Sequence, residues 1–353
     1  MRLAAQERDA MLDEEAGAAD TEQPSVLVVI LNWNCLEDTL TAVESVLRLN
    51  YRNHRILVID NGSTDGSAAC LQNIRNDRVE ILEHTENLGF TGGCNAGFRR
   101  GLESGASYIW LLNSDALIED EDTLGSLVEL AESNPKIGLV SPRLAEPGEA
   151  GNLTFCGGVC QMDPFYYERT GDPKEAESWV GKYPNAGFVS GTAMLVKTSL
   201  IRQIGMLDEK FFAYIEATDF SYRSSQAGYK NLVDENSLVR HAQKKMTLSP
   251  LTIKPHFWYY MARNECLLWR KHIGVIRALR PSWWAFRKMT VHLCRCREAP
   301  NITEAILAGL WHGWINRGGP YCPEYRMPRP VATAVWKYAL AKANPSSSLC
   351  GRE

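Results

Sequence analysis

The first 140 residues alternate between short unbroken apolar runs and segments in which apolar side chains recur at helical spacing. The apolar runs are of strand length, and the amphipathic segments between them predict helices. Because such strands are buried on both faces, the alternation predicts an α/β fold with a mostly parallel sheet and helices on both faces. The predicted strands are Val26–Leu31, Ile56–Ile59, Val79–Leu82, Ile109–Leu112 and Ile137–Val140, and the predicted helices lie around Leu36–Leu47, Gly66–Ile74, Cys94–Leu102 and Leu124–Ala131.

Beyond these elements the pattern is less regular. Residues 145–188 are rich in aromatic side chains and show no clear period, so we expect an insertion or a substrate-facing loop region there. The remaining predicted elements are a strand over Thr192–Val196, a helix over Ala217–Ala227 that ends at Gly228, helical stretches from Pro255, and a last helix through Val331, Val335 and Tyr338.

The formal net charge of -4 conceals a strong asymmetry along the chain. Residues 1–24 carry a charge of -5, residues 25–253 carry -10, and residues 254–353 carry +11 together with seven of the ten tryptophans. We therefore expect a disordered acidic leader, an α/β domain and a basic, Trp-rich helical region, in that order. The basic region predicts an anionic partner, unless it is only a helical subdomain with solvated arginines and tryptophans in its core.

Two further features bear on the compartment. No apolar run approaches the ~18–20 residues of a membrane span, and the first 24 residues lack the apolar core of a secretory signal. The ten cysteines show neither a disulfide framework nor the paired spacing of a zinc site, which is typical of free thiols in a reducing compartment. The sequence therefore predicts a cytoplasmic protein.

Short polar residues follow the predicted strands of the first half. The carboxyl ends of parallel strands meet at one edge of a sheet, where α/β proteins bind ligands. One such group alone would be an ordinary turn or helix cap, but four on one edge predict a binding site. The groups are Asn32, Trp33 and Asn34; Asp60, Asn61, Ser63 and Asp65; Asn87, Gly89, Gly92, Gly93 and Asn95; and Asn113, Ser114 and Asp115.

A nucleotide diphosphate fits the chemistry of these groups. Asp60 can accept hydrogen bonds from a base or a ribose. Gly89, Gly92 and Gly93 would let the backbone approach phosphates near a helix N-terminus. Asp115, at the tip of a strand, suits Mg²⁺ or Mn²⁺ held by one or two carboxylates and diphosphate oxygens. The glycine spacing is neither the dinucleotide fingerprint nor a P-loop, which argues against a dehydrogenase and an ATPase.

A combination of short motifs extends over about residues 25–275. The motifs are Val28–Asn34, Val58–Gly66, Asn87–Gly93, Leu111–Asp115, Ser190–Leu195, Leu207–Phe212, Asp219–Arg223 and Ala227–Tyr229. Together they resemble glycosyltransferase family 2, and most of all its rhamnosyltransferase-like branch. The resemblance implies a GT-A nucleotide-diphospho-sugar transferase fold, with residues 25–253 as the catalytic domain and residues 254–353 as a C-terminal helical extension. It also implies an inverting single displacement and a divalent metal.

The resemblance further implies roles for single residues. Asp60 would hold the nucleoside. Asn113-Ser114-Asp115 stands where the family has its metal motif, with Asp115 as the carboxylate on the metal side, and His241 matches a histidine that lies at the metal or the diphosphate. Arg263-Asn264 resembles a recurring feature of the same branch, but the sequence assigns it no role.

One position departs from the family pattern. The family has a Glu-Asp pair whose Asp is the general base, whereas this chain has Glu216-Ala217. Alanine cannot take a proton, and a general base contributes ~10²–10⁴ in rate. Three alternatives stay open: an inactivating substitution at Ala217, a base supplied instead by Glu216 or Asp219, or a catalytically inactive sugar-nucleotide-binding protein.

The resemblance predicts transfer of rhamnose or another deoxyhexose or hexose from a nucleotide-diphosphate donor to a hydroxyl of a glycan or lipid-linked glycan. The setting would be bacterial surface polysaccharide synthesis. A nucleotidyltransferase is the rival enzyme, but its Gly-rich basic loop is replaced here by Asn32–Cys35. The basic region would contact an anionic membrane at its inner face, close the acceptor cleft or form a homodimer interface. It lacks any motif that reads nucleic acid.

Overall fold

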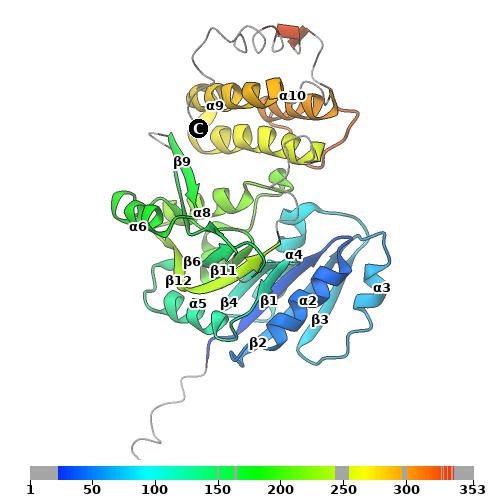
Figure 1. Cartoon of the computed structure of the whole chain (residues 1–353), viewed down its shortest axis with the longest axis vertical. Helices are drawn as coiled ribbons and strands as arrows, with labels where there is room; N and C mark the ends of the chain where they lie inside the picture. Colours follow the sequence, from blue (N-terminus) through cyan, green and yellow to red (C-terminus); the bar gives the residue numbers. More distant parts are fainter. Residues whose placement is uncertain are drawn as a thin grey trace, which may run out of the picture.

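The computed structural model describes residues 23–148, 151–162, 165–242, 254–295 and 300–326, together with single positions between 328 and 337. Apart from its last two residues, the predicted acidic leader lies outside the described residues, and so does most of the predicted last helix. Figure 1 shows a body built on a β-sheet, with a layer of helices above it that comes from the C-terminal part of the chain.

The body contains one nine-stranded mixed sheet. Its strands are β1 Val26–Asn32, β2 His54–Asn61, β3 Val79–His84, β4 Tyr108–Asn113, β5 Ala116–Ile118, β6 Ile137–Ala145, β7 Leu153–Phe155, β11 Ala193–Lys197 and β12 Lys230–His241. The strand order is β3-β2-β1-β4-β11-β6-β12-β5, with β7 beside β6. β1 to β4 pair in parallel, as do β6 and β12, whereas β11 runs antiparallel to both neighbours. All the predicted strands of the sheet form.

Helices cover both faces of this sheet. Along β1, Val28 and Ile30 pack on one side, towards α2 (Leu36–Leu47) and α5 (Thr123–Glu132). Leu27 and Val29 pack on the other side, towards α4 (Gly89–Glu103), α7 (Thr198–Ile204) and α8 (Glu216–Gln226). This alternation follows from the two-residue period of a strand, and it confirms the predicted α/β class. The helices and one 3-10 turn of the body are α2 Leu36–Leu47, α3 Ser67–Leu71, α4 Gly89–Glu103, α5 Thr123–Glu132, α7 Thr198–Ile204, η1 Glu209–Phe211 and α8 Glu216–Gln226.

The glycine-rich segment differs from its prediction. We expected a turn before a helix at Cys94, but α4 already begins at Gly89. A Cβ at Gly93 would lie 2.3 Å from Cδ1 of Leu31, and one at Gly97 would lie 2.5 Å from Cγ1 of Val29. The glycines therefore let α4 lie close against β1, which explains why glycine follows glycine inside a helix despite its conformational cost.

Residues 145–188 also differ from their prediction, because much of this segment is regular. It contains the small sheet of β8 Gly157–Met162, β9 Phe165–Thr170 and β10 Gly187–Phe188, in the order β10-β8-β9, and the helix α6 Pro173–Lys182. The aromatic side chains that obscured the strand period pack together. Phe188 stacks on Tyr167 with 5.3 Å between ring centroids, and it lies 6.0 Å from Phe155.

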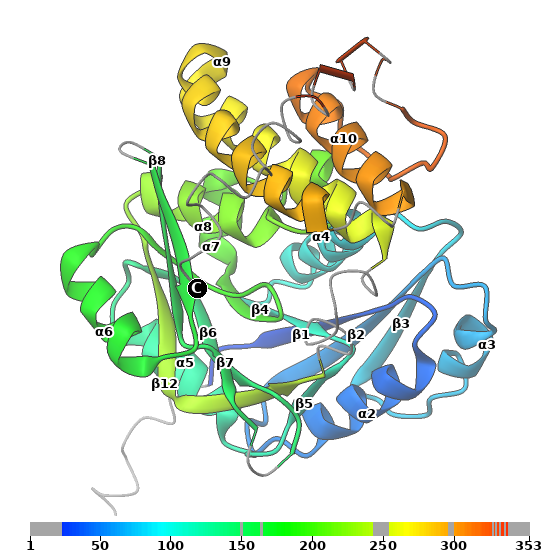
Figure 2. The ribbon, with the colours of Figure 1, turned by 45° about the horizontal axis from the view of Figure 1, so that its top comes forward.

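The region after residue 254 is helical, as predicted. It contains α9 Pro255–Arg295, interrupted at Gly274 where φ is 76° and ψ is 167°, and α10 Pro300–Trp314. α9 and α10 lie side by side above α8 and α4 (Figures 1 and 2). Trp258 and Trp269 are buried, so these two tryptophans belong to the interior of the region. None of the helices in the described ranges is long and apolar enough to cross a membrane.

Candidate active site

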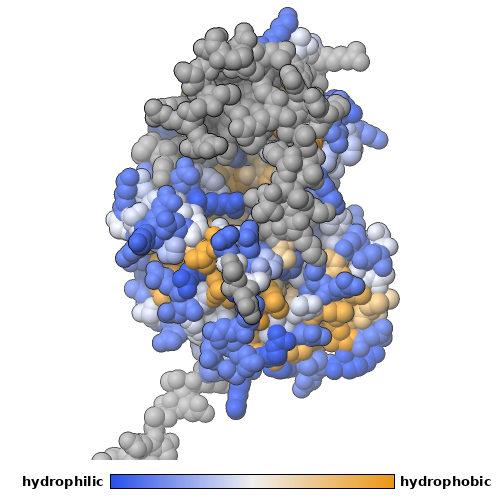
Figure 3. Space-filling model, in the orientation of Figure 1, coloured by the Kyte–Doolittle hydropathy of each residue, from blue (hydrophilic) through white to orange (hydrophobic). Residues whose placement is uncertain are grey.

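A cavity of about 1000 Å³ lies where the carboxyl edge of the sheet meets α8 and α9. The strand register brings the predicted polar groups to this edge, since Asn32 pairs with Asp60 across β1 and β2, and Leu31 pairs with Asn113 across β1 and β4. In the space-filling view, hydrophobic surface lies in the hollow above the sheet body, among hydrophilic residues (Figure 3). The polar lining predicted from the sequence comprises Trp33, Asn61, Asn87, Gly89, Asn113, Ser114, Asp115 and His241.

Asp60 is held beneath this edge by a hydrogen-bond network. The side-chain amide of Asn32 donates to its Oδ1 at 2.6 Å, and the backbone N–H of Ser63 donates to its Oδ2 at 3.0 Å. The Asn32 amide also donates to the Ser63 hydroxyl at 3.1 Å. Asp60 is buried and is not in the cavity lining. Its carboxylate therefore fixes the loop after β2. A nucleoside in the cavity would interact with Asp60 only through Asn32 or Ser63, the residues bonded to it.

Asp115 and His241 form the pair that the sequence placed at the metal. Nε2 of His241, at the end of β12, lies 3.1 Å from Oδ1 of Asp115 and 3.4 Å from Nδ2 of Asn113. The antiparallel pairing of His241 with Ala116 brings the two side chains together across β5 and β12. Both residues line the cavity, and the buried Nδ1 of His241 has no hydrogen-bond partner among the described residues.

A divalent cation fits this pair only with help from a substrate. Mg²⁺ and Mn²⁺ bind through one or two protein side chains when diphosphate oxygens and water complete the shell. Within the described residues, no cluster of three or more His, Cys, Asp or Glu side chains could hold a metal alone. The carboxylate and the imidazole face the open cavity, so the residues present fit a cation that arrives with a diphosphate.

Several predicted donor residues do not line the cavity. Asp65 accepts hydrogen bonds from the backbone and hydroxyl of Ser67 and so shapes the turn before α3. Asn95 bonds both the N–H and the C=O of Leu207, each at 3.0 Å, and so ties α4 to the segment before η1. The other predicted residues that lie outside the cavity lining are Asn32, Asp60, Ser63, Gly92 and Gly93.

Glu216 and Ala217 begin α8 at the cavity wall. Both side chains line the cavity, and a Cβ at Gly191 would lie 3.5 Å from Oε1 of Glu216 and 3.2 Å from Cβ of Ala217. Oε2 of Glu216 is buried and has no hydrogen-bond partner among the described residues. Burial raises the pKa of Glu216 to about 7, which is the range of a general base that works near neutral pH.

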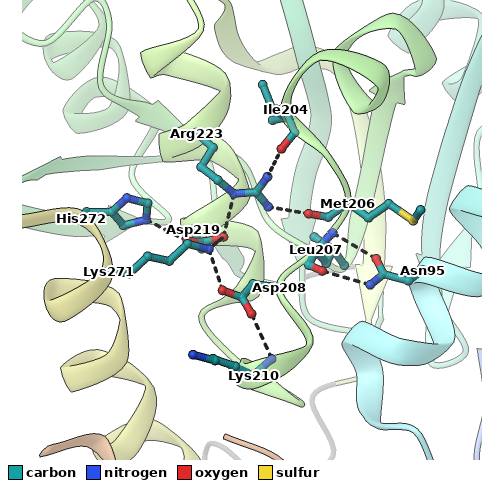
Figure 4. Close-up of polar contacts among 10 residues, drawn as sticks. All are labelled: Asn95, Ile204, Met206, Leu207, Asp208, Lys210, Asp219, Arg223, Lys271 and His272. Carbon is teal, nitrogen blue, oxygen red and sulfur yellow. Dashed lines mark hydrogen bonds and ion pairs between the residues drawn. The ribbon is translucent and has the colours of Figure 1, made fainter. Parts of the chain in front are cut away.

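Asp219 lies one turn further along α8 and faces away from the cavity. Its fully buried carboxylate bonds Nε of Arg223 at 2.9 Å, Nζ of Lys271 at 2.9 Å and Nε2 of His272 at 2.7 Å (Figure 4). Burial alone would raise its pKa, but the hydrogen bond from His272 and the charges of Arg223 and Lys271 lower the pKa to about 2. Asp219 therefore lies outside the cavity lining and has a low pKa, and both features argue against the alternative that made it the base.

The far side of the cavity has an aromatic wall that the sequence did not identify. Tyr214 lies edge-on to Phe257 with 5.2 Å between centroids, and Phe212 stacks on Tyr260 at 5.5 Å. Tyr321 also lines this side. We refer to these five residues as the aromatic wall. Of these residues, only Phe212 falls within a motif named from the sequence, Leu207–Phe212.

The α/β fold and a cavity with this carboxylate–histidine pair are those of a glycosyltransferase. Residues 27–205 match the model of glycosyl transferase family 2, and the chain belongs to that family. The family resemblance, the enzyme class and the GT-A-type fold expected from the sequence are thereby confirmed.

Known proteins similar to this chain act in glycan synthesis. The low-salt glycan biosynthesis hexosyltransferase Agl10 of Haloferax volcanii is 25% identical over 327 residues, covering 88% of this chain and 97% of that protein. The N-acetylglucosaminyl-diphospho-decaprenol L-rhamnosyltransferase of Mycobacterium tuberculosis is 25% identical over 218 residues, covering 54% of this chain and 67% of that protein.

A solved structure shares the fold. The mannosyltransferase PcManGT from Pyrobaculum calidifontis, in complex with GDP-Man and Mn²⁺, aligns with a TM-score of 0.54 at 17% identity, covering 91% of this chain and 87% of that one. At this identity the likeness concerns the fold, and it extends into the helices after residue 254 because it covers nearly the whole chain.

Proposed function

We propose that this chain transfers a hexose or deoxyhexose, with inversion, from a nucleotide-diphosphate donor to a hydroxyl of a glycan or lipid-linked glycan. The observation that carries the proposal is that the Asp115–His241 pair and the Glu216 carboxyl line the same cavity. A donor site and a base on one cavity are what a single displacement needs, because the donor and the acceptor must meet in line.

The donor would lie along the carboxyl edge of the sheet. Asn61 donates to the side chain of Asn87 and to the backbone of Gly89, each at 3.1 Å, so these three residues form a fixed floor. Asp115 and His241 would hold Mg²⁺ or Mn²⁺ at the diphosphate. The bound ion would neutralise the negative charge that grows on the leaving diphosphate.

Glu216 is the proposed general base. It would take the proton of the acceptor hydroxyl as the acceptor oxygen bonds to the anomeric carbon and the bond from that carbon to the diphosphate oxygen breaks. The proton ends on Glu216, and the negative charge ends on the nucleotide diphosphate.

Two alternatives from the sequence remain in competition, namely an inactivating substitution at Ala217 and an inactive sugar-nucleotide binder. The membership of the chain in glycosyl transferase family 2 argues against the third alternative, a nucleotidyltransferase.

The acceptor would lie against the aromatic wall. Aromatic faces pack well on the apolar faces of pyranose rings and on lipid chains, and Tyr214 and Tyr260 add hydroxyl groups for polar contacts. The relative from Mycobacterium tuberculosis is named for an acceptor that carries a sugar on diphospho-decaprenol. We therefore favour a lipid-linked glycan, with rhamnose or a hexose as the transferred sugar.

A screen of nucleotide-sugars by thermal shift, with and without Mn²⁺, tests the donor assignment. A bound ligand raises the melting temperature by mass action, so the true donor should stabilise the chain only with the cation. Product analysis with that donor and a diphospholipid-linked sugar then tests transfer. Stabilisation without a product would support the inactive binder, and no stabilisation by any nucleotide-sugar would contradict both functions.

Contact with an anionic membrane is a second part of the proposal. After the break at Gly274, α9 exposes Val275, Ile276 and Leu279, and Ile276 is 83% exposed. Apolar side chains on a basic helix are typical of an interfacial segment. We expect co-sedimentation with anionic vesicles at low salt, and no binding under those conditions would contradict this part. A homodimer through the same region stays a prediction.

A further inference from the structure

The loop that precedes α8 has an unusual backbone. Phe212, Tyr214 and Ile215 have positive φ values of 62°, 68° and 70°, although none of them is glycine. Positive φ angles are unfavourable for side chains other than glycine and persist only where the surroundings determine them. This loop, residues 210–215, ends directly at Glu216 and supplies two members of the aromatic wall. Some other part of the molecule must therefore hold the loop in place.

Asn264 supplies one part of that hold. Its side chain is fully buried, and its amide Nδ2 donates to the carbonyl oxygens of Phe211 at 3.0 Å, Ala213 at 2.7 Å and Tyr214 at 2.8 Å. Three carbonyls of one short loop thus point at one amide group on α9. Its Oδ1 accepts from Nε of Arg263 at 2.8 Å, which fixes the amide in this orientation.

Arg263 supplies the other part. Its fully buried guanidinium donates from Nη2 to the carbonyl oxygens of Lys210 at 3.1 Å and Phe211 at 2.6 Å, and from Nη1 to that of Gly319. Its Cζ lies about 5 Å over the rings of Tyr259 and Tyr260. Within the described residues no carboxylate pairs with it. A buried cation is costly unless it is compensated, and here loop carbonyls and aromatic faces provide the compensation.

The loop also touches the donor side of the cavity. The backbone N–H of Thr91 on α4 donates to the carbonyl of Phe212 at 3.1 Å, and a Cβ at Gly89 would lie 2.5 Å from the same oxygen. Loop 210–215 is therefore held between α4, which begins at the floor residue Gly89, and α9, which carries Arg263 and Asn264.

We propose that Arg263 and Asn264 are positioning residues, which hold loop 210–215 so that Glu216 and Tyr214 face the acceptor. This inference rests on the proposed function, because it assigns a task to the loop only if Glu216 serves the transfer. The two residues act through the backbone of the loop and touch neither donor nor acceptor. α9 therefore both covers the cavity and fixes the position of the proposed base.

Asn264→Leu is the test variant, because leucine branches at Cγ as asparagine does, adds no charge and removes all three donated hydrogen bonds. Arg263→Lys is the second variant, which keeps the charge but loses the planar fork. Cys266→Ser is the matched control, since Cys266 is buried on the same helix but packs against α10. Hydrogen–deuterium exchange of the full chain is measured on the peptide over residues 210–217, beside turnover, donor affinity and the pH profile.

We expect the exchange of 210–217 to rise by about tenfold or more in Asn264→Leu, while the sheet peptides and Cys266→Ser stay as in the wild type. Turnover should fall by about 10²-fold. The donor affinity should stay within about twofold of the wild type, since the substituted side chain makes no hydrogen bond to the floor residues Asn61, Asn87 and Gly89. The acidic limb of the pH profile should move to lower pH, because a loosened loop admits water to Glu216. If Asn264→Leu loses its fold, Arg263→Lys is expected to show the same pattern more weakly.

The two failures can be told apart. If the wild type transfers sugar but both variants keep its local exchange and pH profile, the positioning role is wrong and the proposed function stands. A uniform rise in exchange over the whole body, with no preference for 210–217, would likewise overturn the positioning role. If the wild type transfers no sugar, the proposed function fails, and the exchange data alone then decide whether the two residues hold the loop.

Discussion

Nε2 of His272 on α9 lies 2.7 Å from the carboxylate of Asp219 on α8, inside the body of the molecule. Lys271, the preceding residue, reaches the same carboxylate at 2.9 Å and Asp208 at 2.8 Å. The basic helical region is therefore bonded to the helix that begins with the proposed base, and the two share one ionic network centred on the buried carboxylate of Asp219 (Figure 4).

Asp219→Asn is expected to destabilise the fold by about 1.5–3 kcal/mol, because it removes charge-assisted hydrogen bonds between a buried carboxylate and its partly exposed cationic partners. The folded pKa of Asp219 is about 2, below the usual 3.8, so its contribution is present above about pH 4 and is lost as the pH falls toward 2. Urea unfolding of wild type and variant at pH 7 and pH 3 measures this. Asp208→Asn is the control and should cost at most about 1 kcal/mol, since its side chain is partly exposed. Equal curves for Asp219→Asn and wild type at pH 7 would contradict the network.

Glu216→Gln is expected to lower turnover by about 10²–10⁴-fold, because the amide cannot accept the acceptor's proton. In the wild type, kcat/KM should fall about tenfold per pH unit below pH 7, since only the ionised carboxylate is a base. Steady-state rates between pH 5 and pH 9 measure both effects. Full activity in Glu216→Gln would remove Glu216 from the mechanism.

Ala217→Asp distinguishes the remaining explanations of the missing family base. The Cβ atoms of Ala217 and its neighbour reach the same cavity, so an aspartate at 217 would also face the acceptor. We expect the double variant Glu216→Gln, Ala217→Asp to recover about tenfold or more of the rate lost in Glu216→Gln. A large gain in Ala217→Asp, together with no loss in Glu216→Gln, would instead identify Ala217 as an inactivating substitution.

Removal of the Glu216 charge should also stabilise the protein at alkaline pH. Burial raises the pKa of Glu216 from its usual 4.5 to about 7, so between these values the folded chain holds a proton that the unfolded chain has released. Stability therefore falls as the pH rises through this window. Glu216→Gln should be more stable than the wild type at pH 8 by up to about 3 kcal/mol, with little difference at pH 4.5. Thermal melts at the two pH values decide this, and a variant that is less stable than the wild type at pH 8 would contradict the raised pKa of Glu216.

Asp115→Asn should weaken binding of the donor with Mn²⁺ by about tenfold or more, because a neutral amide is a poor ligand for a divalent cation. Chelation of divalent ions should have the same effect on the wild type. Titration calorimetry with the nucleotide-sugar found by the screen measures the affinity. Asp65→Asn serves as control, since Asp65 only shapes a turn. An equal loss in both variants would speak against a cation at Asp115.

Six strands of the sheet were predictable because each is a short, largely apolar run, and Val26–Leu31 is the clearest case. β5, β7 and β12 were not predicted, and β12 contains many polar residues. The strands of the small sheet were not predictable, because aromatic side chains such as Phe155, Tyr167 and Phe188 pack together there and hide the two-residue period. The break at Gly274 lay within a helical pattern that continues on both sides of it. Periodicity alone therefore missed the places where tertiary packing determines the backbone.

The candidate site was predictable where a family motif assigns a role to a residue. Asp115 and His241 are far apart in the sequence, and only the family motif joined them before the fold did. Asp65 and Asn95 were grouped with the donor residues but lie outside the cavity lining, because aspartate and asparagine suit turns and backbone bonds as well as ligands. The aromatic wall stayed hidden because its members come from separate segments, and nothing in Tyr214 or Tyr321 alone distinguishes a wall from a core.

Most of the donor side of the cavity comes from the first half of the polypeptide, at the ends of β1, β2 and β4, and His241 is its contribution from the second half. Loop 210–215 and α9, which also belong to the second half, form the opposite side. Grafting the second half of another family member that has a histidine at the position of His241 onto this first half should thus give a hybrid that keeps its sugar source and changes its recipient. The junction would have to precede η1, so that Arg263, Asn264 and the loop they grip travel together.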